Sequence, residues 1–219
     1  MSNQVLGGLK VETAKRTIVG LAMLLAPLLL LVGFSIHPPE PRDGAQLLGV
    51  IANDAGRWNA AHVLFALSMV LAIPATSGLM ELLEHRGGAK FGLIGGSLAV
   101  VGVIFLTLFI GVELAMSAIA RSVPVEEYAR IEPAMQALID FDGPLPVVFV
   151  GLSLNLGLFV LGVGLISART VPRWTGVAIE VAALVLVGGL FSNPIGAVGA
   201  AVLLVGLGAI GLGVLKSVR

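Results

Sequence analysis

Six apolar runs, each about long enough to cross a bilayer, constrain this chain more than any other feature. They cover residues 17–36, 59–83, 91–120, 146–168, 173–191 and 194–215. A helix needs roughly 20 apolar residues to span the hydrocarbon core, and an open β-structure would leave backbone groups unpaired there. The runs therefore predict an all-α, polytopic transmembrane bundle of six helices, forming a single domain over residues 1–219.

Composition supports a membrane protein and excludes several kinds of chemistry. Hydrophobic residues make up 57% of the chain and charged residues 12%, far from the averages of soluble domains. The absence of cysteine excludes disulfides, thiolate nucleophiles and cysteine-ligated metals. A formal net charge of zero argues against nucleic acid as a partner. The expected partner is the lipid bilayer; no cofactor is indicated, and any metal is left open.

The distribution of basic residues predicts the orientation of the helices. The two terminal tails and the loops at 84–90 and 169–173 together hold nine lysines and arginines, whereas the opposite side holds four. Because cytoplasmic segments carry the excess of basic residues, both termini are expected in the cytoplasm.

Two long connections on the outer side contain amphipathic patterns. The stretch DGAQLLGVIANDAG places Leu47, Leu48 and Ile51 on one face behind a capping signal at Asp43. The stretch VPVEEYARIEPAMQALIDFDG spaces apolar residues in the same helical manner, with Met135, Leu138 and Ile139 at its end. We expect two short amphipathic outer-loop helices, which either cover the mouth of the bundle or rest on lipid headgroups.

Glu113 lies inside an apolar run, where an ionisable group is costly unless it has a partner. At about 100° per residue it shares a helix face with Ser117 and with a stripe of small residues, so it should point into the bundle. His62 lies at a similar predicted depth on a face with Asn59. These residues are candidates for a ligand-binding pocket on the outer side (His62, Glu113, Asn59, Ser117). The alternative is a structural His–Glu pair that fixes the helix register.

Glu180 is a second carboxylate within an apolar run, about two turns inside the cytoplasmic end of its helix. Arg173 lies on nearly the same face, seven residues earlier. The two residues form either a structural ion pair or a second intramembrane site near the inner surface.

The last run is rich in glycine, with Gly196, Gly199, Gly206 and Gly213 spaced for close helix packing. That packing can occur within one subunit or between subunits, so a homo-oligomer through glycine-rich helices is possible on this pattern. No phosphate loop, HExxH or GxSxG motif is present. The sequence therefore assigns no catalytic residue and favours a protein that is not an enzyme.

The layout of KRTIVGLAMLLAPLLLLVG, a polar outer loop, RWNAAHVLFALSMVLAIPATSGLMELLEHRG and KFGLIGGSLAVVG resembles a broad group of uncharacterised bacterial six-helix membrane proteins. The resemblance covers mainly the first half of the chain. It implies a location in the bacterial inner (plasma) membrane as a multi-pass protein and carries over no functional residue.

Three functions remain open on these observations. The first is binding or transport of a small ligand, cation or proton through an outward-facing polar pocket, which two intramembrane carboxylates favour. The second is a non-catalytic accessory or structural protein that docks a partner protein, and the third is a membrane-embedded enzyme.

Overall fold

The structure, a computed structural model, describes residues 3–41, 43–84, 87–140, 144–189 and 191–218. Over these ranges the chain is all-helical, with no β-strand, as the apolar runs predict. The elements are α1 (Asn3–Ile36), α2 (Gly44–Asn53), α3 (Ala55–Glu84), α4 (Ala89–Ser122), the 3-10 helix η1 (Val125–Glu127), α5 (Tyr128–Asp140), α6 (Pro144–Ala168), α7 (Arg173–Gly189) and α8 (Asn193–Lys216).

Each of the six predicted runs forms a helix, but not all six helices are long and apolar enough to cross a membrane. Among the described residues, four helical stretches are long and apolar enough to cross a membrane: Val11–Ile36 of α1, and the whole of α3, α4 and α8. Leu152–Ala168 of α6 is a shorter apolar stretch, and α7 has 17 residues. Four candidate spans are thus present over the described ranges.

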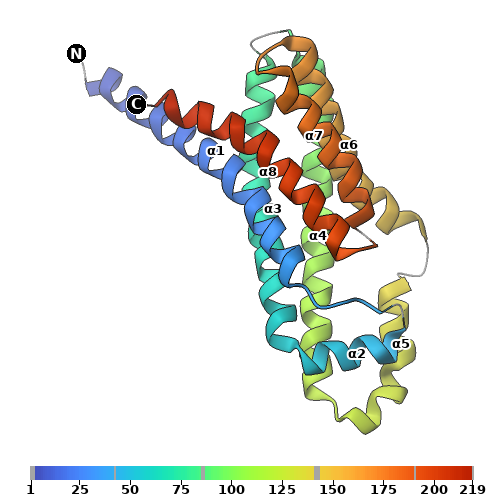
Figure 1. Ribbon diagram of the computed structural model, residues 1–219. Helices are drawn as coiled ribbons and strands as arrows, with labels where there is room; N and C mark the ends of the chain where they lie inside the picture. The colour runs from blue at the N-terminus through green and yellow to red at the C-terminus, as the bar shows by residue number, and fades with distance from the viewer. Residues whose placement is uncertain (1–2, 42, 85–86, 141–143, 190, 219) are drawn as a thin grey trace.

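The six long helices pack in the order of the chain. α1 packs on α3, α3 on α4, α4 on α6, α6 on α7, α7 on α8, and α8 returns to α1, so the helices close into a ring of antiparallel neighbours. Figure 1 shows both termini at the same end of the bundle as the α3–α4 and α6–α7 connections. We call this the terminal end, and the opposite end, which carries α2 and α5, the cap end.

Glycines allow the closest approaches between these helices. A Cβ atom added to Gly95 of α4 would lie 2.9 Å from the carbonyl oxygen of Gly157 in α6. The predicted stripe of small residues on α4 therefore faces α6. In α8, Gly196, Gly199 and Gly206 are packed closely against side chains or backbone of the same chain, whereas Gly213 has open space around it.

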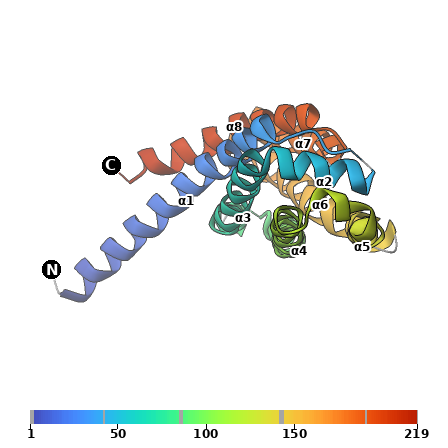
Figure 2. The same cartoon turned by 90° about the horizontal axis from the view of Figure 1, so that it is seen from below.

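The cap end contains the two short helices that the amphipathic patterns predict. Asp43 caps α2, its side chain accepting a hydrogen bond of 2.9 Å from the backbone N–H of Gln46. The apolar face of α2 is buried in a cluster that joins it to α3, α4 and α5 (Leu47, Leu48, Ile51, Trp58, Met116, Ala120, Tyr128). Figure 2 looks along α4 and shows α2 lying across the ends of the long helices, so α2 covers this end of the bundle. The side chains of Met135, Leu138 and Ile139, predicted for the second amphipathic face, lie outside the described part.

Candidate functional site

The structure joins His62 of α3 to Glu113 of α4, the partnership that the sequence suggests. Nε2 of His62 lies 2.8 Å from Oε2 of Glu113, and Nδ1 lies 2.7 Å from the carbonyl oxygen of Trp58. A carbonyl oxygen can only accept, so Nδ1 carries a hydrogen and donates it. The Nε2–Oε2 contact then holds one further proton, on either the imidazole or the carboxyl group. Only 1% of the His62 side chain and 14% of the Glu113 side chain are exposed.

His37 lies beside this pair, at the end of α1. It lies outside the helix, directly after Ile36, yet its ring centroid is 4.9 Å from that of His62 and its side chain is only 1% exposed. The reason is local. Pro38 and Pro39 cannot continue the helix, and the chain after them runs across the mouth of the bundle, carrying His37 with it.

The two nitrogens of His37 have different surroundings. Nδ1 lies 2.7 Å from the carbonyl oxygen of Pro38 and 3.2 Å from Nδ2 of Asn193, the first residue of α8. Asn193 Nδ2 also donates to the Pro38 oxygen at 3.1 Å. Nε2 lies 3.3 Å from Oε1 of Glu40 but, among the described residues, makes no hydrogen bond. A buried nitrogen of His37 is therefore left open toward Glu40.

Three further aromatic rings pack with the two imidazoles to form a cluster of five. The rings belong to α1, α3 and the segment that follows α1 (Phe34, His37, Trp58, His62, Phe65). Trp58 stacks on His62 with centroids 4.7 Å apart, and its Nε1–H donates to the carbonyl oxygen of Glu113 at 3.1 Å. Stacking and hydrogen bonding together fix the orientation of both histidine rings.

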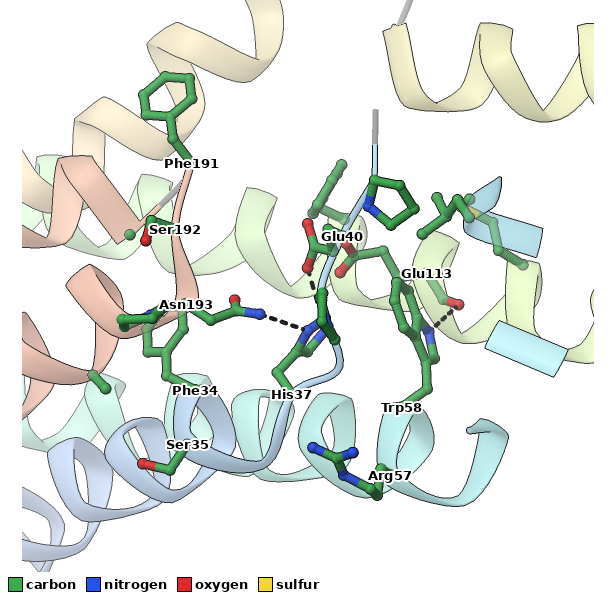
Figure 3. A pocket seen from close by; sticks show the side chains of 18 of the residues that line it. Phe34, Ser35, His37, Glu40, Arg57, Trp58, Glu113, Phe191, Ser192 and Asn193 are labelled. Carbon is green, nitrogen blue, oxygen red and sulfur yellow. Dashed lines mark hydrogen bonds and ion pairs between the residues drawn. The ribbon is translucent and has the colours of Figure 1, made fainter. Parts of the chain in front are cut away.

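These groups surround a pocket of about 800 Å³ at the cap end (Figure 3). Its walls come from the end of α1, the following segment, α2, α3, α4 and the α7–α8 turn. The polar lining includes His37, Glu40, Arg57, Glu113 and Asn193, and the apolar lining includes Phe34, Trp58, Phe109, Met116 and Phe191. Figure 3 shows Glu40 and Glu113 reaching the same space from two different elements.

The surroundings of the pocket shift the pKa values of two groups outside the helices. Burial lowers the pKa of His37 from its usual 6.5 to about 4. The Glu40 side chain keeps 47% of its surface accessible from the open side of the pocket. The protein atoms around its carboxyl group nevertheless displace water and, with the Glu113 carboxylate as a second cause, raise the pKa of Glu40 to about 7. At neutral pH, His37 is thus neutral and Glu40 is poised between its two protonation states.

The other predicted site residues have different positions. Ser117 is buried one turn from Glu113, and its hydroxyl group has no hydrogen-bond partner among the described residues. Of the four residues predicted for the outer pocket, Glu113 lines it, whereas His62, Ser117 and Asn59 do not. Glu180 packs against Gly162 of α6, and no ion pair between it and Arg173 occurs over the described ranges. The structure therefore keeps Glu180 apart from the cap-end pocket.

Sequence reasoning missed His37, Glu40 and Asn193 as members of the site. The only local signal is the spacing in SIHPPEP, where two prolines stiffen a segment that carries a histidine and a carboxylate three residues apart. Asn193 lies 156 residues beyond His37. Its contribution depends on the closure of the helix ring, which a reading of single segments does not reveal.

The arrangement offers hydrogen-bond acceptors, a titratable carboxyl group and an aromatic wall. Among the described residues, no group of three or more His, Asp or Glu side chains is placed to hold a metal ion. The groups that line the pocket can bind a small molecule by hydrogen bonds and apolar contact. No protein-family model, curated protein or solved structure matches the chain, so these residues carry the functional argument themselves.

Proposed function

We propose that the chain is a six-span protein of the bacterial plasma membrane, with both termini in the cytoplasm and the cap end outside. The ring of antiparallel neighbours supports six spans, because α6 and α7 join α4 to α8 and so complete the ring with the four helices of spanning length. The basic residues support the orientation, since nine of the thirteen belong to the tails and connections of the terminal end.

We propose further that the cap-end pocket binds a small polar ligand or cation. One observation carries this proposal: His37, almost fully buried, leaves Nε2 without a hydrogen bond at the wall of a large pocket. A buried polar atom without a partner costs free energy, of the order of 1–3 kcal/mol, and a bound ligand that supplies the partner recovers it.

The interior of the bundle favours binding over an open path through the membrane. Among the long helices near the centre of the bundle lies a cavity of about 40 Å³, lined largely by apolar side chains, among them Leu30, Leu154, Leu158 and Leu186. A polar ligand finds no acceptor of comparable strength there. Movement of a ligand toward Glu180 requires the helices to rearrange, whereas binding at the pocket does not.

Thermal unfolding of the purified protein in detergent tests the proposal. The ligand panel contains small cations, anions and neutral metabolites, and the proteins are wild type, His62→Ala, Glu113→Gln and the control Glu126→Gln, whose carboxylate is exposed and does not line the pocket. A ligand of this pocket raises the Tm of wild type and of the control, and raises it less in Glu113→Gln, which changes a lining carboxylate, and in His62→Ala, which removes the partner of that carboxylate. Equal shifts in all four proteins, or no shift with any ligand, would overturn the proposal.

A further inference from the structure

The hydrogen-bonding groups that face the pocket near His37 are mostly acceptors. Because Nδ1 of His37 donates to the Pro38 carbonyl, its Nε2 carries a lone pair. That lone pair faces Oε1 of Glu40 at 3.3 Å. When Glu40 is ionised, two acceptors face each other without a hydrogen between them. A proton on Glu40, or a donor from a ligand, is needed to satisfy both.

We propose that the ligand is an organic ammonium ion with at least one N–H group and an apolar tail, and that its N–H groups replace the proton held between Glu40 and His37. This inference rests on the proposed function of the pocket as a binding site. It assigns the chemical class of the ligand and makes binding an exchange of one cation for one proton.

The rest of the pocket fits both halves of such a molecule. Phe34, Phe109 and Phe191 supply an apolar wall for the tail, and aromatic faces attract cations. Arg57, the one arginine among the described residues that line the pocket, is already engaged: its Nη1 donates to Asp54 at 2.8 Å and its Nε donates to the carbonyl oxygen of Ile36 at 3.2 Å. The positive charge of Arg57 is therefore balanced by Asp54 and not by the acceptors around His37.

The exchange balances without a further reactant. Bound ammonium donates to the Glu40 carboxylate and to His37 Nε2, and the proton that Glu40 held leaves to solvent. Within the described ranges, the charged and titratable groups that face Glu40 are His37 directly after α1, Arg57 and His62 of α3 and Glu113 of α4. His62 and Glu113 satisfy each other, and Arg57 is paired with Asp54, so Glu40 is the group that gives up the proton.

Proton release on binding is the direct test. n-Butylammonium is added to wild-type protein in weakly buffered detergent solution containing a pH-indicator dye. For a carboxyl group half-protonated near pH 7, the release is about 0.9 proton per bound ligand at pH 6 and about 0.1 at pH 8, and the affinity rises about tenfold between these values. Binding of n-butylammonium without proton release would overturn the inference.

Three comparison ligands separate the features of the ammonium ion. Tetramethylammonium has the charge but no N–H group, 1-pentanol has the tail without the charge, and valerate has the opposite charge. We expect n-butylammonium to bind more tightly than all three. If 1-pentanol or valerate binds best and its binding is lost in Glu113→Gln, the pocket is a binding site but the ligand class is wrong. If none of the four binds, and the wider panel also fails, the proposed function itself fails.

Glu40→Gln and Glu126→Gln provide matched variants, since both remove one carboxylate and keep the side-chain volume. Glu40→Gln is expected to lose both the proton release and most of the affinity for n-butylammonium, whereas Glu126→Gln keeps both. Equal binding by these two variants would contradict the exchange.

A lipid headgroup amine has the same chemistry, so the wild type is also compared in nanodiscs of phosphatidylethanolamine and of phosphatidylglycerol. Weaker binding of n-butylammonium in phosphatidylethanolamine would identify the headgroup as a competing occupant; equal binding would assign the pocket to a free amine.

Discussion

At the scale of single residues, His37 and Glu40 should give the stability of the protein two opposing pH dependences. The pKa of His37 in the folded protein, about 4, lies below its usual 6.5, so its contribution to stability is complete above about pH 6.5 and is lost as the pH falls toward 4. The shift corresponds to about 3 kcal/mol. The pKa of Glu40, about 7, lies above its usual 4.5, so ionising it lowers stability as the pH rises from 4.5 to 7.

Two variants separate these effects in thermal unfolding measured in detergent between pH 4 and pH 8. His37→Gln should lose less stability than wild type on acidification from pH 6.5 to pH 4, because it has no imidazole to protonate. Glu40→Gln should gain stability relative to wild type at pH 8 and lose that gain near pH 5. Curves for both variants that run parallel to the wild-type curve would show that these side chains do not titrate in the pocket.

The residue scale also shows where prediction from sequence succeeds and where it stops. His62 and Glu113 could be paired because each lies in a helix, and helical geometry gives both depth and face. His37 and Glu40 follow α1 in an irregular segment, whose path depends on the helices that it crosses. Hydrophobic periodicity carries no information about such a path. The positions of His37 and Glu40 in the pocket therefore could not be predicted from the sequence.

At the scale of helices, glycine positions set how closely α4 and α6 approach. A Cβ atom on Gly157 would contact the backbone of Ala99 and, at 2.6 Å, the carbonyl oxygen of Gly95. Backbone atoms cannot move aside as a flexible side chain does. We expect Gly157→Ala to lower the free energy of unfolding by about 1–3 kcal/mol, the usual cost of overpacking. Thermal or denaturant unfolding in detergent measures this effect.

Gly111→Ala is the matched control, since Gly111 lies in α4 and has no atom within 4 Å of its added Cβ. Alanine favours helix more than glycine does, so this variant should be as stable as wild type or slightly more stable. A loss of stability in Gly111→Ala equal to that in Gly157→Ala would mean that the α4–α6 contact is not the cause. The sequence predicts that the stripe of small residues on α4 is buried. Which helix packs against the stripe, namely α6, is known only from the arrangement of the helices in the structure.

At the scale of the whole molecule, the order of the ring explains why the two ends differ. α3 and α4 continue past the neighbouring helices at the cap end, and α2 and α5 pack on these extensions (Figure 1). The end of α1 and the start of α8 lie beside them, so a pocket forms where short helices meet long ones. Apolar runs specify the long helices by length and composition. The difference in their lengths at one end, and thus the pocket, comes from packing.

The absence of native cysteine makes the proposed topology directly testable, because any introduced cysteine is the only thiol in the chain. Ser122→Cys reports on the cap end, Pro172→Cys on the α6–α7 connection and Ser217→Cys on the C-terminal end of α8. In intact cells, a membrane-impermeant maleimide should label only Ser122→Cys, and the other two variants should react after lysis. Labelling of both Ser122→Cys and Pro172→Cys in intact cells would show that α6 does not cross the membrane and would leave the four helices of spanning length as the only spans. Labelling of both Pro172→Cys and Ser217→Cys, without Ser122→Cys, would reverse the orientation, and the pocket would then face the cytoplasm.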